Sequence, residues 1–254
     1  MSWLPAMEIS LLWMLLAITF AATIHGAFAL GFPMVATPLL ALMLDVRQAI
    51  VLTLVPTLLV NILTIARAGR GLQSLKRHGA IIVGIVPGVL LGTQLLVVVE
   101  PNIFRLALAA MILLHLKGDL LQGGSTEWIG QRPHTTGFLA GLIAGTSVGI
   151  VNVMVPILIL YLTMAGLTTT TMAVLFNFCF LTGKLLQIAL LSHHGLFSWQ
   201  VVKSSLPLTV AAGVGVLIGM AIRNRLDETT FLRMLTAVLW VMMVMLVVQF
   251  FFNL

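Results

Sequence analysis

The chain has 254 residues, of which 60% are hydrophobic and only 8% charged, and its formal net charge is +6. Soluble domains carry about a quarter charged residues, so this composition excludes an ordinary soluble enzyme or a nucleic-acid-binding domain. The basic residues flank apolar stretches, where they orient a chain in the membrane and contact lipid headgroups. The composition therefore predicts an all-α polytopic membrane protein whose surroundings are a lipid bilayer, with no nucleic acid as a partner.

Apolar segments of membrane-spanning length follow one another along the chain. The first half contains segments at 10–44, interrupted at Gly31 to Pro33, and at 48–66, 78–99 and 102–117. The second half contains segments at 136–164, interrupted at Gly149 to Asn152, and at 170–191, 200–221 and 230–251. We therefore expect a first repeat at 1–117, a cytoplasmic linker at 118–134 and a second repeat at 135–254.

The two interruptions share a pattern. Gly31 precedes Pro38 by the same spacing at which Gly149 precedes Pro156. Paired apolar segments broken by Gly or Pro in two repeats indicate the substrate site of a transporter, because a membrane helix is broken only where its backbone faces protein, water or a ligand. Further pairs support the repeat: Ala49 and Thr53 with Ala173 and Asn177, and Gly88 and Gly92 with Gly215 and Gly219.

Two membrane topologies fit these segments, and the basic residues favour one. If every segment crosses fully, the flanking Lys and Arg divide seven to five between the two sides. If each interrupted segment enters and returns to its own side, nine lie on one side and three (Arg47, Arg105, Lys203) on the other. Lys and Arg in short loops mark the cytoplasmic side. We therefore expect two inverted repeats in a bacterial inner membrane, each with a broken re-entrant (V-shaped) helix pair plus three transmembrane helices, and both termini outside the cytoplasm.

In this topology the half-helices that follow the two interruptions start near the middle of the membrane. A helix N-terminus carries about half a positive charge and several unpaired N–H groups, which suits an anion. The expected substrate-binding residues at the breaks are Gly31, Phe32, Pro33, Gly149 and Asn152. The alternative is that Gly and Pro merely kink two packed helices.

Polar residues in the next segment of each half share one helix face. They are Thr53, Thr57 and Asn61 in the first half, with Thr64 continuing the stripe, and Asn177, Lys184 and Gln187 in the second. Polar groups inside a membrane face the bundle interior or a wet cavity, so we count the stripes among the substrate-binding candidates. The threonines can instead bond to their own helix. Lys184 can snorkel towards the interface, or its counter-ion can be the substrate.

Other chemistry has little support in the sequence. His25 lies about two turns before the first interruption, where it can carry a proton or serve as a hydrogen-bonded structural residue. Cys179 is alone and mid-segment, so we interpret it as a packing residue. We find no metal-ligand cluster, no P-loop and no nucleophile with a plausible base. We therefore expect no enzyme, no metal and no cofactor.

Motifs in both halves recur in one membrane protein family. They are Thr37-Pro38-Leu39-Leu40 and Val155-Pro156-Ile157-Leu158, the Ala-x-x-x-polar pairs named above, and a loop glycine at Gly71 and Gly195. In this order the chain resembles, over nearly its whole length, the TauE/SafE sulfite exporter family, also called the toluene sulfonate uptake permease family. The resemblance implies transport of sulfur-containing anions such as sulfite, sulfoacetate, thiosulfate or organosulfonates. The consecutive glycines typical of that family at the break are absent here.

We therefore expect a secondary transporter of a small sulfur-containing anion, with access alternating around a midplane site at the repeat interface. The alternatives are a passive anion channel, a transporter of a small carboxylate, and a membrane scaffold without a substrate. The sequence leaves open whether the protein forms a homo-oligomer.

Overall fold

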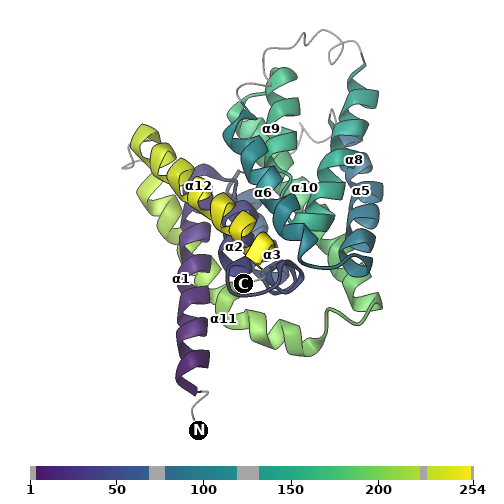
Figure 1. Ribbon diagram of the computed structural model, residues 1–254. Helices are drawn as coiled ribbons and strands as arrows, with labels where there is room; N and C mark the ends of the chain where they lie inside the picture. Colours follow the sequence, from purple (N-terminus) through teal and green to yellow (C-terminus); the bar gives the residue numbers. More distant parts are fainter. Residues whose placement is uncertain (1–3, 69–77, 119–131, 224–227, 253–254) are drawn as a thin grey trace.

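A computed structural model describes residues 4–68, 78–118, 132–223 and 228–252. Within these ranges the regular structure is entirely helical (Figure 1). The helices are α1 (Leu4–Phe28), α2 (Phe32–Ala41), α3 (Val46–Ala68), α5 (Gly79–Val98), α6 (Ile103–Leu116), α8 (Pro133–Val151), α9 (Val155–Met164), α10 (Thr169–His193), α11 (Trp199–Ile222) and α12 (Glu228–Phe252). By length and composition seven of the described helices can cross a membrane, and α2, α6 and α9 are shorter. The prediction of an all-α polytopic membrane protein is confirmed.

The two halves have the same order of helices and run in opposite directions. Each contains a long helix followed by a ten-residue half-helix, α1 with α2 and α8 with α9, and then three longer helices. In Figure 1, α1 rises from the N-terminus whereas α8 descends from the opposite edge of the bundle. The halves are therefore inverted repeats. Most of the expected linker at 118–134 lies outside the described residues, so the boundaries between the repeats stay a prediction.

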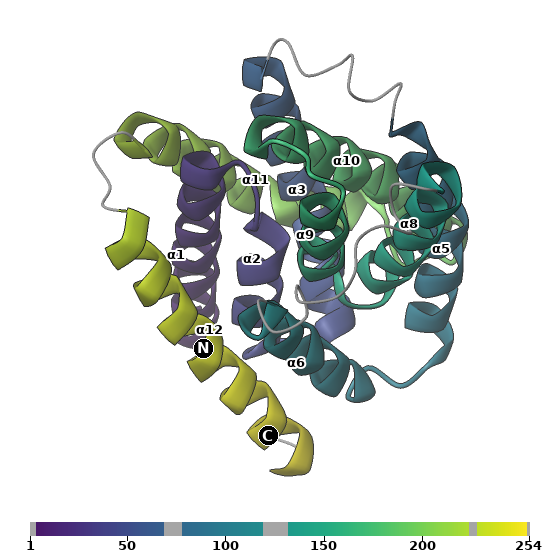
Figure 2. The ribbon, with the colours of Figure 1, turned by 90° about the horizontal axis from the view of Figure 1, so that it is seen from above.

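The long helices of the two halves exchange partners. α5 packs along α8, and α11 packs along α1 in the same way; these pairs flank a centre formed by α2, α3, α9 and α10 (Figure 2). A Cβ on Gly92 would lie 2.2 Å from the Thr146 carbonyl oxygen, and one on Gly219 would lie 2.1 Å from that of Thr23. Small residues let helix backbones approach this closely, so the spaced glycines form the interfaces between the repeats.

Each half-helix follows a left-handed residue. α1 is followed by Ala29 at φ 62° and α8 by Asn152 at φ 64°. α2 then begins at Phe32 and α9 at Val155, and each has a proline at its second position, Pro33 or Pro156, where a missing N–H costs nothing. By their place in the half-helices, Pro33 of the first half therefore corresponds to Pro156 of the second.

The interruption expected at Gly149 to Asn152 is present, but it begins only at the last of these residues. α8 continues through Gly149 to Val151, and the chain leaves the helix only at Asn152. Gly149 serves helix packing instead, because a Cβ there would lie 2.6 Å from the Thr93 amide nitrogen of α5. The two glycines of the shared Gly-to-Pro spacing thus have different settings: Gly149 lies inside α8, whereas Gly31 lies at a break, as the N-cap of α2 at φ 99°.

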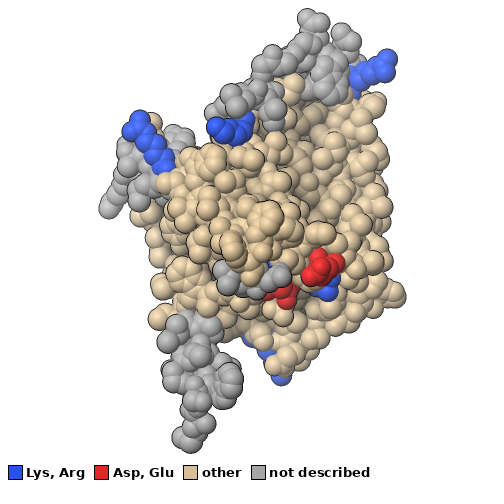
Figure 3. Space-filling model, in the orientation of Figure 1, with Lys and Arg blue, Asp and Glu red and all other residues tan. Residues whose placement is uncertain are grey.

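The face shown in Figure 3 carries its basic residues unevenly. Lys and Arg side chains gather along the upper edge of the molecule in Figure 3, whereas the lower edge shows blue side chains next to acidic ones. The upper edge is where α6 ends and α8 begins (Figure 1), close to Lys117 and Arg132. The assignment of the two sides of the membrane stays a prediction.

Candidate functional site

The second break is held by hydrogen bonds to the first half. Asn152 is fully buried, and its Nδ2 donates to Oγ1 of Thr37 in α2 (2.7 Å) and to Oγ1 of Thr53 in α3 (3.0 Å). The Thr53 hydroxyl donates to the Ala49 and Ile50 carbonyls, so it accepts from Asn152. Thr53 lies about 10 Å inside α3 at 1.5 Å per residue, so the second break lies well below the end of that helix.

The first break is held by the second half in the corresponding way. Asn177 of α10 donates through Nδ2 to the carbonyl of Ala29 (2.8 Å) and to that of Ala173 (2.7 Å). Asn177 and Thr53 are the positions that the sequence repeat had paired. Each break is thus fixed to the long third helix of the opposite half, which places both breaks at the interface between the repeats.

His25 supports the first break through both ring nitrogens. Its Nδ1 accepts from the Phe32 amide, the first N–H of α2, at 3.3 Å. Its Nε2 lies 3.1 Å from Thr64 Oγ1. Because the Thr64 hydroxyl donates to the Val60 carbonyl, it accepts from His25, which fixes the neutral Nε2–H tautomer. His25 therefore occupies the N–H that was expected to bind an anion at this helix end, and Pro33 has no N–H to offer.

Lys184 and Gln187 lie beside α8, close to the second break. Lys184 Nζ donates to Gln187 Oε1, and Gln187 Nε2 donates to the Gly149 carbonyl at 3.1 Å. Both side chains are fully buried. Among the described residues no carboxylate pairs with Lys184. The chain from Lys184 to Gly149 ties α10 to the last turn of α8, three residues before the break.

The other expected site residues have mixed surroundings. The Thr57 hydroxyl bonds to the Thr53 carbonyl at 2.6 Å, which is the local bonding considered as the alternative. Phe32 is fully buried in the main hydrophobic core. Asn61 is also fully buried, and neither its Oδ1 nor its Nδ2 has a hydrogen-bond partner. The stripe on α3 is therefore buried as expected, but only Thr53 and Thr64 contact the residues that hold the breaks.

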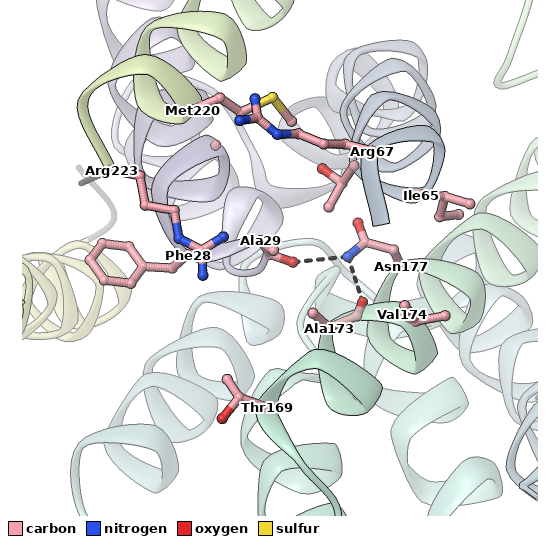
Figure 4. Close-up of a pocket in the computed structure, with 12 residues that line it drawn as sticks. Phe28, Ala29, Ile65, Arg67, Thr169, Ala173, Val174, Asn177, Met220 and Arg223 are labelled. Carbon is pink, nitrogen blue, oxygen red and sulfur yellow. Dashed lines mark hydrogen bonds between the residues drawn. The ribbon is translucent and has the colours of Figure 1, made fainter. Parts of the chain in front are cut away.

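A cavity of about 330 Å³ leads to the first break. Four helices contribute its lining: Gly26, Phe28 and Ala29 beside α1 and its break, Thr64, Ile65 and Arg67 from α3, Thr169, Ala173, Val174 and Asn177 from α10, and Met220 and Arg223 at the end of α11. Figure 4 shows Arg67 and Arg223 reaching towards this space, with Asn177 bonded to Ala29 and Ala173. Sequence reasoning missed both arginines as site residues, because it treated them only as markers of membrane topology.

At the corresponding place on the opposite side, which we call the closed side, hydrogen bonds hold two helix ends together. There the start of α3 meets the end of α5, and Arg47 joins them. Its Nε donates to the Leu96 carbonyl (2.9 Å) and its Nη2 to those of Val97 (3.2 Å) and Val99 (2.8 Å). Thr171 takes the position of Arg47 in the second half, where the cavity opens.

A charged cavity that ends at an interrupted intramembrane helix, between two inverted repeats, is typical of membrane transporters. Comparison with known families gives the same class: residues 14–246 match the family described as Sulfite exporter TauE/SafE. The match covers nearly the whole chain, and the protein belongs to this family of membrane transporters. No curated protein and no solved structure matches the chain.

Proposed function

We propose that the protein is a secondary transporter of a small sulfur-containing anion, such as sulfite or an organosulfonate, and that the anion binds in the cavity between Arg67 and Arg223. The observation that carries this proposal is that two guanidinium groups border a cavity that ends at a helix break. A guanidinium matches the oxygens of an oxyanion through two parallel hydrogen bonds. Membership of the family supports the sulfur-containing class.

The apolar part of the lining suits an organic group on the anion. Ile65, Val174 and Met220 share the cavity with the arginines. The volume of about 330 Å³ lies at the small end of the range for ligand pockets. A sulfonate with a short carbon chain would place its charge between the arginines and its methylene groups against these side chains.

Access to the site alternates between the two sides of the membrane. The cavity opens on the side that carries more basic residues, which we assign to the cytoplasm. In this assignment the protein lies in the bacterial inner membrane, and both of its termini lie outside the cytoplasm. The opposite opening would form between α3 and α5 when Arg47 releases α5, and it would expose the cluster around Asn152 and Lys184. The inverted repeats support this exchange, because each half can adopt the arrangement of the other.

A binding screen on the purified protein tests this function. Sulfite, ethanesulfonate and small carboxylates of equal charge would be compared by thermal shift, since a ligand that binds only the folded state raises its stability. We expect the sulfur oxyanions to stabilise the protein. Stabilisation by carboxylates alone would overturn the substrate class, and flux into proteoliposomes that does not saturate would favour a passive anion channel.

A further inference from the structure

His25 stands where the corresponding break of the second half has an apolar residue. At the first break the amide of Ala29 donates to the His25 carbonyl at 2.6 Å. At the second break the amide of Asn152 donates to the Val148 carbonyl at 3.0 Å. Ala29 and Asn152 are the left-handed residues of the two breaks, so His25 and Val148 are equivalent positions. Because valine serves at one of them, a helix break of this kind does not itself require a histidine.

The His25 ring holds the start of α2 only while it is neutral. Its Nδ1 accepts from the Phe32 amide at 3.3 Å, and its Nε2–H donates to Thr64 Oγ1. A protonated imidazole is a donor at both ring nitrogens. A proton on Nδ1 therefore breaks the bond to Phe32 and leaves the bond to Thr64 in place. The first N–H of α2 becomes free, and the ring beside it gains a positive charge.

The charged side chains that share the surroundings of His25 are basic. Arg67 from α3 and Arg223 at the end of α11 line the cavity. α10, whose Asn177 lies within hydrogen-bonding reach of His25, carries Lys184 about two turns further along. α2 has no charged residue, and its N-terminus adds a partial positive charge. These groups oppose a further positive charge on His25 while no anion occupies the cavity.

The helices around His25 offer no carboxylate that could offset this charge. The sequences of α2, α3, α10 and α11 contain neither Asp nor Glu. Glu8 of α1 lies near the other end of that helix, about 25 Å away at 1.5 Å per residue. The other titratable or cationic residues of these helices lie at the ends away from His25: Arg47, His193 and Lys203. An anion bound in the cavity supplies the negative charge that these helices lack.

From this arrangement we infer that the proton is a second substrate: His25 takes up one proton when the anion enters the cavity, and the two are carried together. The inference rests on the proposed function and names its coupling ion. The proton comes from water in the cavity, whose lining includes Gly26 and Thr64 next to the ring. The imidazolium and the freed Phe32 amide then present positive charge to the anion at the deep end of the cavity. Each ligand therefore raises the affinity for the other.

The decisive measurement is the number of protons taken up for each anion bound. Isothermal titration of the purified full-length protein with ethanesulfonate, in buffers of different ionisation enthalpy at about pH 6.5, gives this number. A sulfonate stays ionised at this pH, so the proton cannot go to the ligand. We expect about 0.5–1 proton for each anion, and an affinity that rises by up to about tenfold for each unit by which the pH falls.

Two variants assign the proton to His25. His25→Gln and His25→Asn each offer an amide oxygen to Phe32 and an amide N–H to Thr64, but neither can take up a proton. We expect both to bind ethanesulfonate without proton uptake and with an affinity that does not depend on pH. His193→Gln, the same change at an exposed histidine outside the cavity lining, is the control and should keep the uptake.

The outcomes separate the inference from the proposed function. Ethanesulfonate binding to the wild type without proton uptake, or undiminished uptake in either His25 variant, would overturn the inference and leave the proposed function standing. If neither ethanesulfonate nor sulfite binds to the wild type, the proposed function fails and the inference with it. A purely structural role of His25 would change the unfolding temperature of the variants but not the number of protons taken up.

Discussion

Arg47 is the residue whose removal should open the closed side of the protein. It is half-buried and makes hydrogen bonds of 2.9, 3.2 and 2.8 Å to three carbonyls at the end of α5. One hydrogen bond to a charged group contributes about 1.5–3 kcal/mol net, and water competes for a half-buried guanidinium. We therefore assign the whole contact about 2 kcal/mol, which corresponds to about a 30-fold increase in the open fraction when Arg47 becomes Ala.

Thiol labelling measures this opening. Leu96 is fully buried beside Arg47, so Leu96→Cys in a Cys179→Ala background reports access from the closed side to a membrane-impermeant maleimide. We expect Arg47→Ala to raise the labelling rate by up to about 30-fold and Arg47→Lys to give an intermediate rate. Lys203→Ala, which removes an exposed cation elsewhere in the chain, is the control. Equal labelling rates with and without Arg47 would refute the assignment of a closing role.

Two further changes test the packing and the buried polar cluster. Gly92→Ala should lower the unfolding temperature, at a cost of about 1–3 kcal/mol, because its Cβ would meet a backbone oxygen at 2.2 Å. Gly79→Ala is the control and should leave the unfolding temperature unchanged, because no atom lies within 4 Å of a Cβ there. Similar unfolding temperatures for the two variants would contradict the close contact at Gly92. Lys184→Met should abolish sulfite transport in proteoliposomes while leaving sulfite binding in the cavity intact, and transport at the wild-type rate would dismiss its role.

The sequence predicted the architecture well because membrane proteins obey few and strong rules. Apolar length sets the spans, and the glycine pairs that supported the repeat lie where helices of the two halves pack closely. The equivalence of Thr53 and Asn177 also came from the repeat, and the structure places each of them against the break of the opposite half. Apolar length, glycine spacing and the repeat can each be read from the order of residue types along the chain, so the sequence is enough to predict them.

What the sequence could not supply is which groups already have partners. His25 occupies the first N–H of α2, and Thr57 bonds to its own helix; both facts depend on the fold. Gly149 was expected at the second break but is a contact residue inside α8, so the break begins only at Asn152, the last residue of the expected interruption. The signal that could have corrected it was the pairing of Pro33 with Pro156, since proline favours the first turn of a helix.

Arg67 and Arg223 were missed for a related reason. They lie far apart in sequence, at the ends of α3 and α11, and each is ordinary for a basic residue next to a membrane-spanning helix. Only the packing of α1, α3, α10 and α11 brings them to one cavity. A pattern along the chain cannot contain that proximity.

Binding of the anion between Arg67 and Arg223 is tested most directly by the affinity for sulfite after removal of the two arginines. Isothermal titration would compare the wild type with the double variant Arg67→Gln and Arg223→Gln, and with a control that carries Lys117→Gln and Arg132→Gln. The control removes two exposed charges that lie outside the cavity lining. We expect the first double variant to bind sulfite at least about 100-fold more weakly, since two charge-assisted contacts are lost, and the control to bind normally. Equal affinities in the two double variants would contradict it.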